Sequence, residues 1–256
     1  MDADVAVHAD ALTRILSDLD ERPVDAVFGS YDDTPAHPGT VSQYRNLLHH
    51  FVHQQSAHEV ESFWAGCGAV RREAFLAAGE FDEKRYRLPE MEDVELGYRL
   101  RDAGSRILLD PAILGTHRKR WTLASMMRSD FLRRGLPWTR LLIARKMLLS
   151  PRGLSLGGSE RASALLAVLC LVLLVAAVGT WSAPIFLLSA IAAAAFVLAS
   201  WKFLSFIDRM RGHAAAFAAV PLHLIYNIVA VSAFAWGIIE SPFLSQTSPE
   251  RYTRPQ

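Results

Sequence analysis

The chain has 256 residues, enough for one ordinary domain and an appendage, with a formal net charge of +1 and 51% hydrophobic residues. These averages would suit a soluble protein, but charged residues are concentrated before residue 162 and sparse after it, so the chain has a polar front and an apolar back. The two cysteines, Cys67 and Cys170, lie on opposite sides of this partition. That separation argues against a structural disulfide and favours a reducing compartment for the front.

The polar front alternates between helix and strand signals. Asp10 can cap the first helix, while Gly79 and Gly104 can end later ones. This alternation predicts an α/β layered domain. The expected elements are a helix at 10–19, a strand at 25–31, a helix at 41–58, a strand at 62–70, a short helix at 71–78, a helix at 94–103 and a strand at 107–109.

A basic stretch follows the predicted domain. Ten Lys and Arg residues and a single acid, Asp130, lie between residues 118 and 152, interleaved with apolar side chains. This pattern predicts one or two amphipathic helices in the membrane interface, bound to anionic lipids. Nucleic acid is the alternative partner for a basic run, but the apolar segments that follow favour the lipid surface, so we expect no nucleic-acid binding.

Three uncharged stretches in the back half are long enough to cross a bilayer: 162–181, 183–201 and 214–239. A buried core of soluble helices is the alternative, but uncharged stretches of this length are rare in soluble folds. Basic residues precede the first stretch and lie between the second and third, so the positive-inside rule places the front half and the 202–213 loop in the cytoplasm. The acidic start, without a following apolar stretch, agrees with this placement. We therefore expect a multi-pass plasma-membrane protein whose tail, 241–256, lies outside.

An acidic pair opens the chain, Asp2-Ala3-Asp4, followed by Val5, Ala6 and Val7. Two carboxylates one residue apart, beside a β-strand, can hold Mg²⁺ or Mn²⁺ through oxygen. A metal held in this way keeps open positions for a diphosphate leaving group. The alternative is a solvated acidic terminus, and the pair alone does not decide between them.

A second acidic cluster, Glu90-Met91-Glu92-Asp93-Val94-Glu95, runs into the helix predicted at 94–103. Carboxylates at a helix N-terminus are stabilised by the helix dipole, so simple capping is one interpretation. A carboxylate there can also act as a general base towards a hydroxyl group. Crowding of Glu92 against Asp93 would raise at least one pKa and improve that base.

The two acidic motifs and the segments between them follow one another in a characteristic order. They are Asp-x-Asp, Phe63-Trp64-Ala65-Gly66-Cys67-Gly68, Arg71-Arg72-Glu73-Ala74-Phe75, Gly79-Glu80-Phe81-Asp82 and Glu92-Asp93-Val94-Glu95-Leu96-Gly97-Tyr98-Arg99-Leu100. This order resembles glycosyltransferase family 2 over roughly residues 1–145. The resemblance implies a GT-A Rossmann-like fold, a nucleotide-sugar donor and inverting transfer. It implies that Asp2 and Asp4 bind metal and diphosphate, and that Asp93 is the catalytic base with Glu92 beside it. It also implies that Gly66, Cys67 and Gly68 line the acceptor side.

Two further matches are looser. Arg133-Arg134 and Trp138 are similar to the family's Arg-Trp motif, which implies contact with the donor diphosphate or a lipid phosphate; contact with lipid headgroups is the alternative. His117 could be a third metal ligand, as in some GT-A enzymes. A packed or solvated histidine is the alternative.

The chain departs from the family's pattern at its start, because the metal motif normally follows the strands that hold the nucleotide. We therefore expect residues 1–117 to form the C-terminal, acceptor-side half of a GT-A domain. Basic interface helices at 118–161, three spans within 162–240 and a tail at 241–256 would follow. The expected activity of the intact enzyme is metal-dependent transfer of a sugar to a lipid-linked or glycan acceptor at the cytoplasmic membrane face. The alternative is a truncated, non-catalytic membrane subunit that binds lipid or a partner protein.

Overall fold

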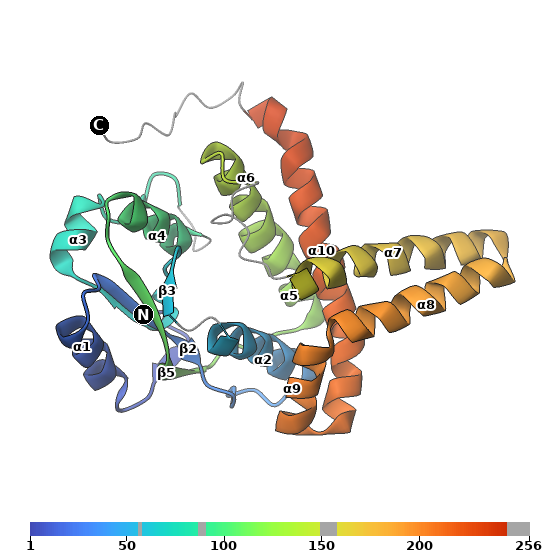
Figure 1. The fold of residues 1–256 in the computed structure, drawn as a ribbon, viewed down its shortest axis with the longest axis horizontal. Helices are drawn as coiled ribbons and strands as arrows, with labels where there is room; N and C mark the ends of the chain where they lie inside the picture. Colours follow the sequence, from blue (N-terminus) through green and yellow to red (C-terminus); the bar gives the residue numbers. More distant parts are fainter. Residues whose placement is uncertain (56–57, 87–90, 149–157, 245–256) are drawn as a thin grey trace. The chain divides into compact units, whose positions relative to one another are not determined.

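The computed structural model describes residues 1–55, 58–86, 91–148 and 158–244, and these form two compact units, residues 1–123 and 124–256 (Figure 1). Glu90, Arg152 and most of the expected tail lie outside the described residues.

The first unit mixes helices and strands. Its elements in chain order are β1 (Val5–Val7), α1 (Ala11–Glu21), β2 (Ala26–Tyr31), α2 (Thr40–Gln55), β3 (His58–Val60), a single 3₁₀ turn (Ala65–Cys67), β4 (Gly68–Val70), α3 (Arg72–Ala77), α4 (Glu92–Asp102) and β5 (Ile107–His117). The expected α/β class is therefore confirmed for this unit.

Within the described residues, five strands form one sheet in the order β1-β5-β2-β4, with β3 also paired to β5. The β2–β5 pair is parallel and the other pairs are antiparallel. β5 is the longest described strand and has three partners: β3 pairs with its first three residues, β1 pairs with its last three, and β2 pairs with it from Ile107 to Gly115. The two ends of the unit's sequence therefore meet at one edge of the sheet.

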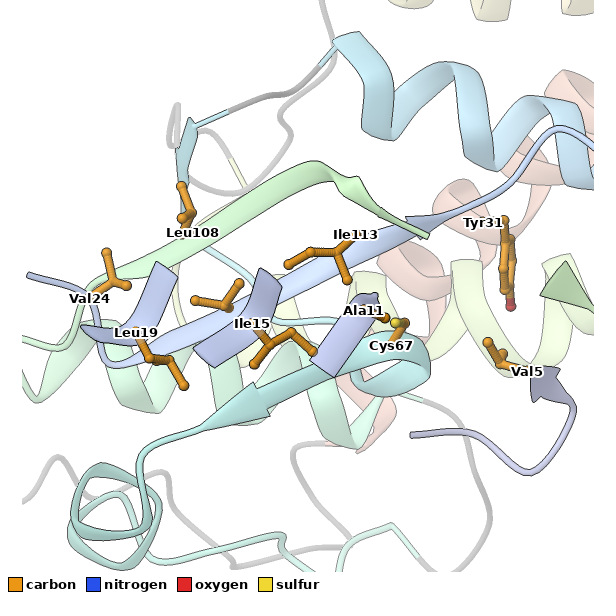
Figure 2. Close-up of a cluster of buried hydrophobic side chains, with 10 residues drawn as sticks. Val5, Ala11, Ile15, Leu19, Val24, Tyr31, Cys67, Leu108 and Ile113 are labelled. Carbon is orange, nitrogen blue, oxygen red and sulfur yellow. The ribbon is translucent and has the colours of Figure 1, made fainter. Parts of the chain in front are cut away.

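Hydrophobic side chains cover both faces of this sheet. On one face, Ala11, Ile15 and Leu19, spaced four residues apart on α1, pack with Val27 of β2 (Figure 2). On the other face, Leu96 and Leu100 of α4 pack with the neighbouring strand residues Ala26 and Phe28. The alternation along β2 follows from the two-residue period of a strand, and it places α1 and α4 on opposite faces.

Two expected strands differ from the observed ones. The strand expected at 62–70 is wrong for its first six residues, since only Gly68–Val70 is a strand. The reason is a close approach of helix α4: a Cβ atom on Gly97 would lie 2.2 Å from the backbone nitrogen of Phe63. The strand expected at 107–109 continues to His117, past Pro111, because the β2–β5 register shifts at this point and accommodates a residue without an N–H donor.

The second unit is helical over its described residues. It contains α5 (Leu123–Arg128, whose first residue belongs to the other unit), a π-helical segment (Ser129–Gly135), α6 (Leu136–Ala144), α7 (Gly158–Thr180), α8 (Ala183–Ala199), α9 (Trp201–Arg211) and α10 (His213–Leu244). Helices therefore occupy residues 123–144 of the basic stretch, where the sequence predicts helices, whereas residues 118–122 are not helical. The segment 202–213, expected to be a loop, is largely helix α9.

Among the described helices, α7 and α10 are long and apolar enough to cross a membrane. Helix α8 has 17 residues and meets the same test only together with α9, from which it is bent by 67°. The described chain therefore contains two candidate spans, or three if the bent pair counts as one. This composition agrees with a membrane protein.

Candidate functional site

Asp4 and His117 face each other at the edge of the sheet. The β1–β5 register pairs Val5 with His117, and the N–H of Arg118 donates to the carbonyl oxygen of Asp4 at 2.8 Å. This pairing leaves Asp4 Oδ2 3.8 Å from His117 Nε2. The histidine side chain is 6% exposed and the aspartate 40% exposed, so the carboxylate lies at the surface and the imidazole lies beneath it.

Aromatic packing fixes the orientation of His117. Its ring stacks on Tyr31 of β2, with ring centroids 4.2 Å apart and planes 11° from parallel. Trp64 meets the Tyr31 ring edge-on at 4.8 Å, and Trp121 lies 6.4 Å from His117. The imidazole is therefore packed, as one of the two expected interpretations has it, and it also lies next to a carboxylate.

Asp2 is tied to the 3₁₀ turn at Ala65–Cys67. Its N–H donates to the carbonyl oxygen of Gly66 at 3.3 Å. Gly66 is covered by the indole of Trp64, since a Cβ there would lie 2.0 Å from the ring. Gly68 is similarly restricted, with a Cβ position 2.8 Å from Phe28 Cβ. These two glycines allow the turn to pass between aromatic side chains and the sheet.

Cys67 has a different role from the two glycines. Its side chain is 1% exposed and belongs to the hydrophobic cluster under α1, where burial raises the pKa of the thiol. The turn therefore uses Cys67 as a core anchor, while Ala65 and Gly66 offer their backbone groups to the two acidic motifs.

Asp93 is the second residue of α4 and lies on the other side of the same turn. Its Oδ2 accepts a hydrogen bond from the N–H of Ala65 at 3.0 Å, and its Oδ1 accepts one from Val94 at 2.7 Å. The pKa of Asp93 is raised to about 6. Burial is the main cause, the charges of Glu92 and Asp2 act in the same direction, and the two backbone hydrogen bonds oppose the rise. Asp2 acts on the pKa of Asp93 although the two residues lie 91 positions apart in the sequence.

The donor set for a metal is partial. No group of three or more His, Cys, Asp or Glu side chains suited to a metal occurs among the described residues. Asp4 and His117 offer one carboxylate and one imidazole 3.8 Å apart, with Asp2 two residues away. Mg²⁺ is commonly bound through one or two carboxylates together with substrate phosphate oxygens, so this set fits a metal that a diphosphate helps to hold.

The remaining predicted residues belong to the helical unit. Arg133 and Arg134 end the π-helical segment, and Trp138 lies in α6. Arg133 is exposed, whereas Arg134 and Trp138 are half-buried.

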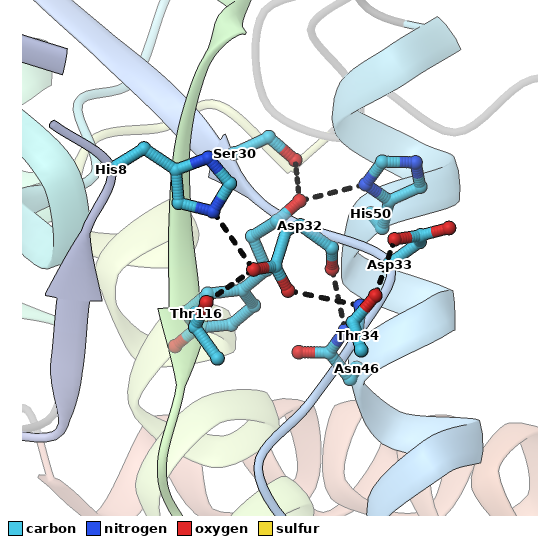
Figure 3. Close-up of polar contacts among 9 residues, drawn as sticks. His8, Ser30, Asp32, Asp33, Thr34, Asn46, His50 and Thr116 are labelled. Carbon is cyan, nitrogen blue, oxygen red and sulfur yellow. Dashed lines mark hydrogen bonds and ion pairs between the residues drawn. The ribbon is translucent and has the colours of Figure 1, made fainter. Parts of the chain in front are cut away.

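Sequence reasoning missed a buried polar network around Asp32, which directly follows β2 (Figure 3). Asp32 Oδ2 bonds His8 at 3.0 Å and accepts a hydrogen bond from the hydroxyl of Thr116, while Oδ1 accepts from the N–H of Thr34 at 3.0 Å. The carbonyl oxygen of Asp32 accepts from the side chain of Asn46 at 2.6 Å. An Asp-Asp-Thr run after a buried strand was the available signal. The network joins the end of β1, the end of β2 and the residue before His117.

Comparison of the sequence with family models and with curated proteins gives no match. The resemblance to glycosyltransferase family 2 therefore depends on the residues and motifs quoted above.

Proposed function

We propose that the chain is a glycosyltransferase that transfers a sugar from a nucleoside-diphosphate sugar, with inversion, to an acceptor at a membrane surface. The observation that carries this proposal is the shared turn at Ala65–Cys67. Asp2 of one acidic motif binds its Gly66 carbonyl, and Asp93 of the other accepts its Ala65 N–H. If Asp2 only belonged to a solvated terminus and Asp93 only capped a helix, the two acidic motifs would have no need to contact the same turn.

Asp93 suits the role of a general base. A pKa of about 6 leaves the carboxylate ionised near pH 7 yet basic enough to accept a proton from a hydroxyl group. Its two backbone hydrogen bonds hold both carboxylate oxygens in place and leave lone pairs for the acceptor. Asp93 would take the proton as the acceptor oxygen bonds to the anomeric carbon. The bond from that carbon to the diphosphate breaks on the opposite face, which gives inversion.

Asp4, His117 and Asp2 are the residues that would hold Mg²⁺ or Mn²⁺. A bound divalent metal supplies positive charge that stabilises the departing diphosphate. The exposed carboxylate of Asp4 can reach such an ion, and the stack on Tyr31 keeps the imidazole of His117 directed towards Asp4.

The apolar helices support a membrane location for the acceptor. A lipid-linked or glycan acceptor at the cytoplasmic face of the plasma membrane suits a protein with candidate spans and a basic segment next to them. Arg133, Arg134 and Trp138 would then bind the donor diphosphate or an anionic lipid phosphate. The alternative is a non-catalytic membrane subunit, and activity measurements separate the two.

The test uses the full chain in lipid nanodiscs with Mn²⁺, a panel of uridine- and guanosine-diphosphate sugars, and polyprenyl phosphate or an oligosaccharide as acceptor. We expect acceptor-dependent release of the nucleoside diphosphate with at least one donor, and its loss in Asp93→Asn with a hydroxyl acceptor. A polyprenyl phosphate already carries an ionised oxygen, so Asp93→Asn should impair that reaction less. No release with any donor would favour the non-catalytic subunit, and full activity of Asp93→Asn on a hydroxyl acceptor would remove Asp93 as the base.

A further inference from the structure

Helices α7 and α8 form a hairpin closed by Trp181 and Ser182. They pack along each other, and their outward side chains are large and apolar, including Val175, Leu187 and Ile191. At 1.5 Å per residue, the 23 residues of α7 and the 17 residues of α8 span about 35 and 26 Å, close to the thickness of a hydrocarbon core. Each arm of the hairpin can therefore cross a bilayer.

The middle of α10 packs against one part of this hairpin. Val220, Leu224 and Ile228, at a spacing of four residues, contact a cluster formed by Ala167 and Cys170 of α7 with Ala192 and Phe196 of α8. These partners lie in the half of the hairpin away from its turn. Figure 1 shows α10 running across the hairpin rather than along it to the closed end.

The last part of α10 packs against α6 and the segment before it. A Cβ on Gly135 would lie 2.6 Å from Ala233, and a Cβ on Gly237 would lie 2.7 Å from Thr139. Arg140 of α6 forms a two-pronged ion pair with Glu240 of α10, with Nε–Oε1 and Nη2–Oε2 distances of 2.5 and 3.0 Å. The three contacts follow one stripe of α10, so this part of α10 runs along α6.

Neither α6 nor α9 can lie within the hydrocarbon core. The continuous segment from α5 to α6 carries Arg128, Asp130, Arg133, Arg134 and Arg140, and α9 carries Lys202, Asp208, Arg209 and Arg211. If α7 and α8 each cross the membrane, α6 before them and α9 after them lie on the same membrane face. α10 begins directly after α9 and ends against α6, so both of its ends lie on that face as well.

We therefore propose that α7 and α8 are the membrane-crossing helices, and that α10 is an interfacial helix on the same membrane face as α6 and α9. Its partner surface is the boundary between lipid headgroups and acyl chains. Phe217, Trp236 and Ile239 are 81%, 54% and 62% exposed, and large apolar and aromatic side chains of this kind suit immersion in the interface. Trp181, 82% exposed at the hairpin turn, would mark the opposite interface. This topology replaces the three spans and the outside tail expected from the sequence.

Cysteine accessibility in intact cells tests the topology without reference to any reaction. The full chain, with Cys67 and Cys170 replaced by alanine, receives one cysteine at a time: Thr13→Cys in α1, Ala183→Cys at the hairpin turn and Ser241→Cys in the last turn of α10, the first two on exposed positions and the third on a half-buried one. A membrane-impermeant maleimide is added before or after permeabilisation. We expect Ala183→Cys to label in intact cells, and Thr13→Cys and Ser241→Cys to label only after permeabilisation. Labelling of Ser241→Cys together with Ala183→Cys, and not with Thr13→Cys, would overturn the proposal, as would identical behaviour of all three.

A charge exchange tests the packing on which the topology depends. Arg140→Glu and Glu240→Arg should each lower the thermal unfolding midpoint in detergent, because each places like charges together. The double variant should recover most of the loss, whereas additive losses would show that α6 does not meet the end of α10. Arg133→Glu, on an exposed side chain, is the matched control for a general effect of charge and should not be rescued by Glu240→Arg.

Discussion

The N–H of Ala65 donates a hydrogen bond to Oδ2 of Asp93 at 3.0 Å, so a peptide group in a 3₁₀ turn fixes the carboxylate at the start of α4. The neighbouring peptide unit of that turn, through the carbonyl of Gly66, holds the N–H of Asp2. A displacement of this turn would therefore move the proposed base and the proposed metal motif together.

The pH dependence of transfer should follow the ionisation of Asp93. Because the pKa of this carboxyl is raised to about 6, the fraction able to accept a proton increases as the pH rises through that value. We expect kcat/KM to rise between pH 5 and pH 7 and then level. Asp93→Asn should lower kcat by about 10²- to 10⁴-fold. Glu92→Gln removes a neighbouring negative charge, so it should retain activity and move the rise to lower pH; an unchanged midpoint would contradict the electrostatic coupling.

Asp93 should also make the stability depend on pH. Its pKa is higher in the folded chain than the usual value of 3.8, so folding favours the protonated carboxyl. The stabilising effect of protonation is complete below about pH 4 and is lost as the pH rises through about 6. One pKa unit corresponds to about 1.4 kcal/mol, and solvent screening reduces this for a half-buried group. Asp93→Asn should therefore raise the free energy of unfolding by about 1–2 kcal/mol at pH 8 and hardly at all at pH 4, as measured by thermal unfolding in detergent.

Gly97→Ala should displace the chain at Ser62 and Phe63, and with it the turn at Ala65–Cys67. The added Cβ would lie 2.2 Å from the nitrogen of Phe63 and 2.7 Å from the carbonyl carbon of Ser62, and neither backbone atom can rotate away. We expect a loss of about 1–3 kcal/mol in the free energy of unfolding together with lower kcat. Gly39→Ala is the matched control, since nothing lies within 4 Å of its added Cβ. Equal effects of the two substitutions would show that the α4 approach is not tight.

Asp32→Ala should destabilise the sheet edge that carries Asp4. The substitution removes the acceptor for Thr116 and the N–H of Thr34, and the partner of His8. Loss of a buried acceptor costs about 1–3 kcal/mol, so we expect a decrease in this range or slightly above it. Asp20→Ala, an exposed aspartate on α1, should change the unfolding free energy by less than about 0.5 kcal/mol. A loss for Asp32→Ala no larger than that of Asp20→Ala would count against the network.

Metal removal should act through Asp4. A chelator should abolish release of the nucleoside diphosphate, and Mn²⁺ or Mg²⁺ should restore it. Because Asp4 offers the exposed carboxylate next to His117, Asp4→Asn should raise the metal concentration for half-maximal activity by at least about tenfold. Asp10→Asn replaces another aspartate near the start of the chain, an exposed one, and should leave this metal concentration unchanged. An equal metal requirement in Asp4→Asn would remove Asp4 from the proposed ligands.

The sequence predicts what local pattern determines. The four-residue spacing of Ala11, Ile15 and Leu19 and the glycines after α3 and α4 place those helices correctly to within about two residues. It does not predict contacts over long distances along the chain. The interruption of the strand at Ser62–Trp64 arises from Gly97, 34 positions after Phe63, and the Asp32 network depends on Thr116, 84 positions later. The two acidic motifs can be recognised in the sequence, but only the structure shows that Asp2 and Asp93 contact the same turn.

The position of β5 at the end of the first unit has a consequence for synthesis. Val5 pairs with His117, and β5 is the one partner of β1 among the described strands, so this pairing waits until the ribosome has made the last strand of the sheet. Pairing between residues so far apart in sequence is slow to form, because loop closure precedes any stabilising contact. Asp4 and His117 therefore come together only when the whole unit has been translated. The proposed pair of Asp4 and His117 is therefore assembled last in the first unit, before the apolar helices of the second unit emerge.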